Sequence, residues 1–271
     1  MIDFQNSTPK VDHEDKCSGK ALYVSDIQMD GMLYAKTLRS TVAKAKIKNI
    51  TLPELPEGYY VVDHHDILKE NYVKMIFTDW PVFAKDRVNY IGEPILLVVG
   101  PDKALIDELL SKIKVDYELE TPVFEFVNSA IHKTYVKGDF ASALKNAAKI
   151  VEETYETGYQ EQAYIEPQGM LAYPEGPKKI TLIGSMQCPF YIKNAVMNSL
   201  GYGEDQVRVI QPAVGGAFGG KEEFPSTIGC QLATAVAKIQ KPIKMIFERE
   251  EDILTTTKRH PSKIMMKAVI D

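Results

Sequence analysis

The sequence predicts an α+β fold in which short strands alternate with a few amphipathic helices. Apolar residues make up 45% and charged residues 25% of the 271 residues, as is typical of a globular chain with a sizeable core. An uninterrupted apolar run at 95–99 predicts a buried strand, and apolar residues at helical spacing over 226–239 predict a helix. A chain of this length is expected to form one large domain or two ordinary ones.

The first part of the chain is predicted to consist of short strands separated by turns, because Pro53, Pro56 and Gly58 interrupt its apolar stretches. Extended segments are expected at residues 21–24, 33–37, 45–50, 59–62 and 95–99. Gly100-Pro101 then opens a predicted helix over 102–113, since proline suits the first helical turn. A further strand is predicted over 114–119.

The later part of the chain is predicted to alternate regularly between strands and helices. Residues 121–138 are irregular and are interpreted as a connection, after which Asp139 is a predicted N-cap for a short helix through Ile150. Gly201 stands where a left-handed glycine would end a helix. Strands are expected at 180–186, 206–211, 242–247 and 263–270, and helices at 189–200 and 226–239.

Charge and cysteine content exclude several classes of protein. The 32 basic and 37 acidic residues give a net charge of -5, so no strong basic field favours nucleic acid. Cys17, Cys188 and Cys230 are far apart, which argues against zinc or iron–sulfur sites and fits free thiols in a reducing cytosol. The N-terminus lacks an apolar signal-peptide core, and the apolar runs are too short to cross a bilayer. A cytoplasmic protein without membrane contact is therefore expected.

The sharpest local feature is a glycine-rich loop at 215–220, between a predicted strand and a predicted helix. Its four glycines permit positive φ angles, and its free N–H groups could hold an anion such as a phosphate-bearing ligand. The spacing also satisfies the start of a Walker A loop through Lys221, but Glu222 stands where that motif needs Ser or Thr for Mg²⁺. The remaining alternative for the loop alone is a tight structural turn.

With its neighbours, this loop resembles the molybdenum-binding subunit of the xanthine dehydrogenase and aldehyde oxidase family. The later part carries YIEPQ at 164–168, SMQCP at 185–189, GGAFGGKE at 215–222, REED at 249–252 and RHP at 259–261. The first part carries GKALY at 19–23, GMLYA at 31–35, LRS at 38–40 and VNYIGEP at 88–94. Several motifs in the family's order, from about residue 16 onward, are more specific than any one of them.

The resemblance implies an α/β hammerhead domain at 1–125, a connecting segment at 126–150, and the first part of an α/β molybdopterin-binding domain at 151–271. It implies a molybdenum–pterin cofactor, in the simple or the dinucleotide form, held through its own sulfurs without side-chain ligands to the metal. It also implies hydroxylation of a purine, another N-heterocycle or an aldehyde, with water as the oxygen source. Electrons would leave through iron–sulfur clusters and FAD on partner subunits.

The resemblance also assigns roles to single residues. Gln187 is expected to donate a hydrogen bond to an oxygen ligand of the molybdenum, and Gly216, Ala217, Phe218 and Gly219 to lie beside the cofactor. Phe218 should pack against something, because an exposed phenylalanine forgoes about 1.5–3 kcal/mol of burial.

The acidic residues after the loop have a binding and a structural interpretation. Glu222, with Glu223 as the alternative, is expected to orient substrate together with Phe218; otherwise Glu222 only complements the start of the next helix. Glu166 is interpreted as structural and Lys221 as a surface or phosphate-side cation.

Two histidine-containing segments are interpreted as structural. Arg259-His260-Pro261 is taken as architecture. His64-His65-Asp66 is predicted in a strand whose neighbouring side chains point to opposite faces, which argues against a metal site.

The family's general base, a glutamate, and an arginine–glycine–phenylalanine–glycine segment belong to a second half of a longer subunit, and neither occurs here. No catalytic residue is therefore assigned to this chain, and the isolated chain is predicted to be inactive. A second molybdopterin-domain subunit, an iron–sulfur subunit and an FAD subunit are the expected partners. The alternatives are a truncated, non-catalytic remnant of such a subunit and, less favoured, a P-loop-like nucleotide binder.

Overall fold

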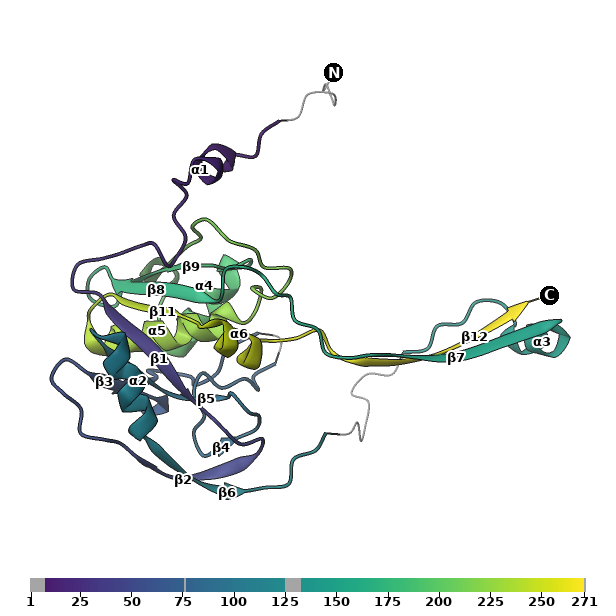
Figure 1. Cartoon of the computed structure of the whole chain (residues 1–271), viewed down its shortest axis with the longest axis horizontal. Coiled ribbons are helices and arrows are strands. Elements are labelled where there is room, and N and C mark those ends of the chain that lie inside the picture. Colours follow the sequence, from purple (N-terminus) through teal and green to yellow (C-terminus); the bar gives the residue numbers. More distant parts are fainter. Residues whose placement is uncertain (1–7, 76, 125–132, 271) are drawn as a thin grey trace. The chain divides into compact units, whose positions relative to one another are not determined.

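The computed structural model describes residues 8–75, 77–124 and 133–270, which form two units (Figure 1). One unit combines the chain up to Thr121 with Ala163–Thr257, and the other combines Pro122–Gln162 with the segment that begins at Lys258. Each unit therefore joins segments that are distant in the sequence.

A seven-stranded mixed sheet forms the centre of the first unit, in the order β10-β9-β8-β11-β1-β5-β3. Strand β1 pairs in parallel with β11, with Leu33 opposite Ile243, so that the early and late segments share one sheet. Strand β5 is buried at every position, as its continuous apolar run predicts. The strands are β1 (Leu33–Arg39), β3 (Tyr60–Val62), β5 (Pro94–Gly100), β8 (Gly169–Pro174), β9 (Ile180–Gly184), β10 (Val207–Ile210) and β11 (Ile243–Ile246).

A smaller three-stranded sheet in the same unit has the order β4-β2-β6. Its strands are β2 (Ala45–Thr51), β4 (Arg87–Val88) and β6 (Lys114–Leu119). Helix α2 (Lys103–Lys112) contacts β1 and β5 and begins at Asp102, whose side chain accepts a hydrogen bond from the N–H of Leu105. Ile106 and Leu109 of this helix pack into a core with Ala45 and Val98.

Two helices cover the other end of the large sheet. Helix α4 (Pro189–Leu200) starts with proline and ends at Gly201 with φ of 68°, as predicted. Helix α5 (Pro225–Ile239) packs closely on it, because a Cβ added at Gly229 would lie 2.7 Å from Ile192. The short elements of this unit are α1 (His13–Cys17), η1 (His64–Asp66), η2 (Glu204–Gln206) and α6 (Arg249–Thr255).

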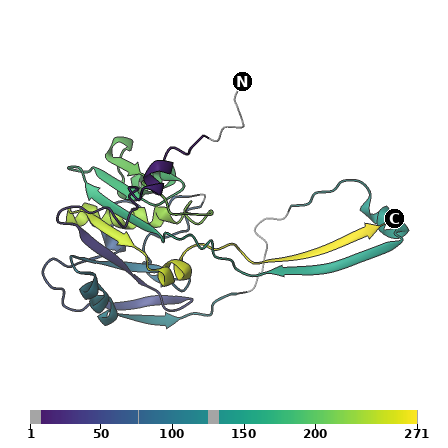
Figure 2. The ribbon, with the colours of Figure 1, turned by 45° about the horizontal axis from the view of Figure 1, so that its top comes forward.

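The second unit contains a two-stranded antiparallel ribbon of β7 (Lys149–Thr157) and β12 (Ser262–Ile270), seen as the long paired arrows in Figure 2. Helix α3 (Phe140–Asn146) precedes β7, and the Asp139 side chain caps it as predicted. The predicted strand 263–270 thus finds its partner inside the described chain. Residues 125–132 of the predicted connection lie outside the described residues.

Several predicted elements are wrong in detail. Residues 21–24 are not a strand, because the Asp26 carboxylate accepts a hydrogen bond from the Tyr23 N–H and closes a turn there. The predicted helix 139–150 ends at Asn146, since the chain continues into β7. Strands β7 and β8 were not expected at all.

The histidine pair is also placed differently from the prediction. His64-His65-Asp66 forms the 3₁₀ turn η1, capped by Asp63, so the two imidazole rings lie 3.8 Å apart between centroids. One ligand atom each from Asp63, His64 and His65 lies within 4.8 Å of the others. The argument from a strand, that these side chains diverge, is therefore wrong.

The apolar character of the helices and the state of the cysteines can be compared with the sequence-based expectations. No helix in the part of the chain that the structure describes combines the length and the apolar character needed to cross a bilayer. All three cysteines are free thiols: Cys17 is exposed, Cys188 is half-buried and Cys230 is buried. Burial raises the pKa of the Cys230 thiol to about 12, so this side chain behaves as a small apolar core residue.

Candidate functional site

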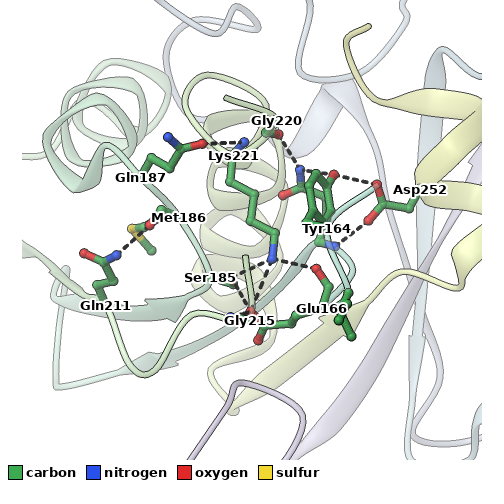
Figure 3. Close-up of polar contacts among 12 residues, drawn as sticks. Tyr164, Glu166, Ser185, Met186, Gln187, Gln211, Gly215, Gly220, Lys221 and Asp252 are labelled. Carbon is green, nitrogen blue, oxygen red and sulfur yellow. Dashed lines mark hydrogen bonds and ion pairs between the residues drawn. The ribbon is translucent and has the colours of Figure 1, made fainter. Parts of the chain in front are cut away.

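The candidate site forms where two parallel strands end. Strands β9 and β10 are hydrogen-bonded in parallel, with Leu182 opposite Val209. Gln187 follows β9 and the loop 215–220 follows β10, so the sheet brings both to the same edge. Figure 3 shows Gln187 beside Gly220 and Lys221 at the end of this loop.

Gln187 is hydrogen-bonded to the loop through its carbonyl oxygen. Its Oε1 accepts from the backbone N–H groups of Gly219 at 3.0 Å and Lys221 at 3.2 Å. These two donors determine the orientation of the amide, because its NH₂ group could not replace Oε1 there. The Nε2 group therefore points away from these donors, and it makes only a long contact of 3.4 Å with Glu222. Gln187 is exposed, so this donor is available to a ligand.

The loop itself presents unpaired backbone donors. Among the described residues, the N–H groups of Gly216, Ala217 and Phe218 have no hydrogen-bond acceptor. Gly216, Phe218 and Gly219 have φ angles of 102°, 51° and 84°, which allow the chain to turn sharply here. Consecutive free N–H groups in such a turn form a concave anion site.

A buried lysine lies behind the loop. Lys221 has no exposed surface, and its ammonium donates to the Glu166 carbonyl oxygen at 2.7 Å, to Glu166 Oε2 at 3.2 Å and to Ser185 Oγ at 2.8 Å. It also lies 4.6 Å from the centroid of the Tyr164 ring. Burial lowers the pKa of Lys221, and Glu166 opposes that effect. The prediction of a surface or phosphate-side cation is wrong, because the ammonium points into the protein.

A second polar cluster joins this region to α6. Tyr164 Oη donates to Asp252 Oδ1 at 2.6 Å, and the Gln168 N–H donates to Asp252 Oδ2 at 2.6 Å. Gln168 Nε2 then donates to the Gly220 carbonyl at 2.8 Å. Burial and the neighbouring Asp252 carboxylate raise the pKa of Tyr164, which stays protonated and donates. Sequence reasoning missed this role for Asp252 and Gln168, although both lie in motifs that were singled out.

Phe218 lies on the surface of the described chain rather than in a core. Its side chain is 78% exposed, because its left-handed backbone turns it outward between the flanking glycines. Phe218 therefore does not pack in the core of its own domain, and its expected position beside the cofactor stays a prediction.

Glu222 and Glu223 are also exposed and precede α5, which begins at Pro225. Together with burial, they raise the pKa of the neighbouring Cys188 thiol. Cys188 therefore stays a neutral thiol beside Gln187.

The Walker A interpretation does not fit this geometry. The strand–loop–helix context is present, but Lys221 is fully buried and bonded to Glu166 and Ser185. A Walker lysine must instead reach the phosphates of a nucleotide. Glu166 agrees with its structural interpretation, since its carboxylate also accepts from Ser185 Oγ and the Gly215 N–H.

Two family models match this chain, one over each part of it. Residues 123–271 match the family model of a molybdopterin cofactor-binding domain, and residues 18–121 match that of the α/β hammerhead domain of aldehyde oxidase and xanthine dehydrogenase. The chain is 32% identical to the large molybdopterin subunit of nicotinate dehydrogenase from Eubacterium barkeri, over 95% of this chain and 64% of that one. It is 29% identical to a probable xanthine dehydrogenase subunit from Bacillus subtilis (strain 168), over 100% of this chain and 38% of that one.

Solved structures share the fold. Quinoline 2-oxidoreductase from Pseudomonas putida 86 superposes with a TM-score of 0.82 at 22% identity, over 98% of this chain and 37% of that one. The aldehyde oxidoreductase from Desulfovibrio desulfuricans superposes with a TM-score of 0.83 at 21% identity, over 98% of this chain and 33% of that one.

These matches define a class of protein, namely chains with an α/β hammerhead domain followed by a molybdopterin-binding domain. This chain belongs to the xanthine dehydrogenase and aldehyde oxidase family of oxidoreductases, which confirms the resemblance and the predicted fold class. The chain spans 64% of the length of the Eubacterium barkeri relative and 38% of the length of the Bacillus subtilis relative.

Proposed function

We propose that this chain forms part of the molybdenum–pterin site of a xanthine dehydrogenase/aldehyde oxidase-type hydroxylase and acts only with further subunits. The observation that carries the proposal is the Gln187 amide, whose oxygen is held by two loop N–H groups while its NH₂ group remains available. The family membership supports the cofactor class, and the arrangement of Gln187 and the loop at the parallel β9–β10 edge supports the proposed location.

The residues present fit such a group. A molybdenum–pterin cofactor carries anionic oxygen and phosphate groups but needs no side-chain ligand to the metal, and the neutral N–H and NH₂ donors of the loop and of Gln187 suit such groups. Gln187 and the N–H groups of Gly216, Ala217 and Phe218 would hold it, with Gly219 keeping the turn open. When bound, the group supplies a two-electron oxidation of a substrate carbon, with the added oxygen derived from water.

The side chains of this chain would bind and orient ligands rather than transfer protons. We assign Gln187 a hydrogen bond to a cofactor oxygen and Phe218 an apolar contact with a planar substrate, since its ring is exposed beside the loop. Glu222, also exposed, is the proposed hydrogen-bond partner of a purine, another N-heterocycle or an aldehyde. The general base, in this proposal, comes from a second molybdopterin-domain polypeptide.

The remaining partners follow from the same proposal. An iron–sulfur subunit and an FAD subunit would carry electrons away, because the three separated cysteines of this chain do not have cluster-binding spacing. The name of the Eubacterium barkeri relative, a large molybdopterin subunit, supports a multi-subunit assembly. The cofactor would be present in its simple or its dinucleotide form.

The test is the molybdenum and pterin content of the complex purified with the subunits encoded beside this chain. Stoichiometric metal and pterin are expected for the unchanged chain. Gln187→Glu keeps an oxygen for the two loop N–H groups but replaces the free NH₂ donor by a carboxylate, so it should lower the cofactor content strongly. Gln28→Glu, the same change at an exposed glutamine outside the loop, is the matched control and should retain it. An assembled complex without molybdenum would instead identify a non-catalytic remnant.

A further inference from the structure

The loop that carries the candidate site is held at both ends by one residue, Glu166. At the first end, the Glu166 N–H donates to the Gly215 carbonyl at 3.2 Å, and the Gly215 N–H donates back to Glu166 Oε2 at 2.8 Å. The approach is so close that a Cβ at Gly215 would lie 2.5 Å from the Glu166 Cβ. The start of the loop is therefore bonded directly to this residue.

At the other end, Lys221 connects the loop to the same carboxylate. Its ammonium has three N–H donors and finds three acceptor atoms, namely the Glu166 carbonyl oxygen, Glu166 Oε2 and Ser185 Oγ. Ser185 Oγ in turn donates to Glu166 Oε2 at 2.6 Å. The cluster is complete in hydrogen bonds, as a buried cation requires.

The backbone of the same lysine holds Gln187. The Lys221 N–H donates to Gln187 Oε1 at 3.2 Å, and the Gln187 N–H donates to the Lys221 carbonyl at 2.7 Å. A displacement of Lys221 would therefore move the Gln187 amide, whose NH₂ group contacts Glu222 at 3.4 Å and would meet the cofactor under the proposed function. Figure 3 shows this chain of contacts from Glu166 through Ser185 and Lys221 to Gln187.

We propose that Glu166 is a positioning residue that holds both ends of the loop 215–221 and thereby sets the orientation of Gln187 and of the free loop N–H groups. We call this arrangement the clamp. Its effect on cofactor binding rests on the proposed function, whereas the clamp itself does not. In this proposal Glu166 acts through its hydrogen bonds with Gly215, Ser185 and Lys221 rather than through a contact with the cofactor.

The clamp is tested by hydrogen exchange of the full 271-residue chain without any cofactor. Glu166→Gln is expected to raise the exchange rate of the Gly219 and Lys221 amides by about tenfold or more through local opening, whereas amides in the β5 strand exchange through global unfolding and report the loss of overall stability. Glu175→Gln, an exposed glutamate of the same unit, is the matched control and should change neither.

Two further variants keep the test decisive if Glu166→Gln does not fold. Glu166→Gln combined with Lys221→Met removes the unpaired buried charge, so this chain should fold and still exchange rapidly in the loop. Glu166→Asp keeps the charge and should return the Lys221 amide to within about threefold of the wild-type rate. A folded double variant with wild-type protection at Gly219 and residue 221 would overturn the proposal.

The cofactor content of the assembled complex distinguishes a failure of the clamp from a failure of the proposed function. Faster loop exchange together with reduced molybdenum and pterin supports both the clamp and the proposed function. Faster exchange with unchanged cofactor content supports the clamp and contradicts the cofactor role of the loop. Unchanged exchange contradicts the clamp whatever the cofactor content.

Discussion

Two lysine–glutamate pairs of this chain have similar lengths but very different surroundings. Lys221 and Glu166 are 3.2 Å apart, and their side chains are 0% and 15% exposed. Lys263 and Glu156, on the β7–β12 ribbon, are 2.9 Å apart and 67% and 66% exposed. The shorter pair is expected to contribute less, because water screens it and both side chains give up rotamer freedom to meet. Burial, rather than the distance between the charged atoms, is therefore expected to determine how much each of these two pairs affects stability.

The backbones around the two pairs differ in the same way. The buried pair lies beside a seven-stranded sheet covered by α4 and α5. The exposed pair lies on a two-stranded ribbon in which Ile264, Met265 and Tyr155 remain exposed. Such a ribbon is marginally stable by itself. Four experiments test whether burial accounts for the difference between the two pairs.

The largest effect is expected for breaking the buried pair. Glu166→Gln leaves the Lys221 ammonium buried without its carboxylate, so the free energy of unfolding should fall by about 3–5 kcal/mol. Urea denaturation of the full chain measures this. The combined change with Lys221→Met should recover most of the loss, because no uncompensated charge remains. If Glu166→Gln lowers the free energy of unfolding by less than about 1 kcal/mol, the buried pair contributes no more than an exposed pair does.

A smaller loss is expected from crowding the same contact without changing any charge. Gly215→Ala places a methyl group 2.5 Å from the Glu166 Cβ, so the backbone of the loop must shift. The expected cost is about 1–3 kcal/mol, measured by urea denaturation. Gly158→Ala is the matched control, since a Cβ there meets nothing within 4 Å. Equal stability of the Gly215→Ala and Gly158→Ala variants would show that the backbone at the start of the loop can shift at little energetic cost.

A pH-dependent effect is expected from a buried carboxyl without a cation. Burial raises the pKa of Glu93 above its ordinary 4.5, although hydrogen bonds from Asn89 oppose the shift. The folded state therefore binds this proton more tightly than the unfolded state, and the resulting stability is present below pH 4.5 and lost as the pH rises through the raised pKa. Glu93→Gln should remove this loss, so its stability relative to wild type should improve from pH 4 to pH 7.

Urea midpoints at the two pH values measure that difference. Glu175→Gln serves as the exposed control and should follow the wild type. A Glu93→Gln variant whose relative stability is the same at both pH values would show that burial does not hold the proton on this carboxyl.

The smallest effect is expected on the ribbon. Lys263→Ala removes the exposed partner of Glu156 and should change the free energy of unfolding by about 0.2–1 kcal/mol. Added salt should shrink the difference further, because mobile ions screen exposed charges. Thermal denaturation at low and high salt measures it. A loss as large as that from Glu166→Gln would mean that exposure does not weaken this pair.

Local signals in the sequence predicted much of the fold. The apolar run of β5, the proline and glycine that bound α4, and the Asp139 cap all act within a few residues of themselves. Strand β8 carries a short buried apolar run at 170–172 that the prediction overlooked. Strand β7 escaped prediction because it is defined by pairing rather than by an apolar period. Of the nine residues of β7, eight are exposed, so no buried stripe marks it.

The candidate site was predicted in composition but not in arrangement. The motifs identified Gln187, the loop and Glu222, which the structure brings to one strand edge with Gln187 and Glu222 3.4 Å apart. Lys221 was misplaced, since nothing in GGKE indicates whether the lysine turns outward or inward. The Asp252 contact was missed because its partners, Tyr164 and Gln168, lie 88 and 84 positions away.

The family, the order of the motifs and the elements with strong local signals follow from the amino-acid sequence alone, because they depend on residues near one another in the chain. Tertiary structure alone decided which side chains are buried, and hence that Glu166 and Lys221 form a clamp while Glu156 and Lys263 form a weak surface pair. Both pairs consist of the same two residue types. Their expected contributions to the free energy of unfolding differ because of desolvation and screening, which depend on atoms from distant parts of the chain.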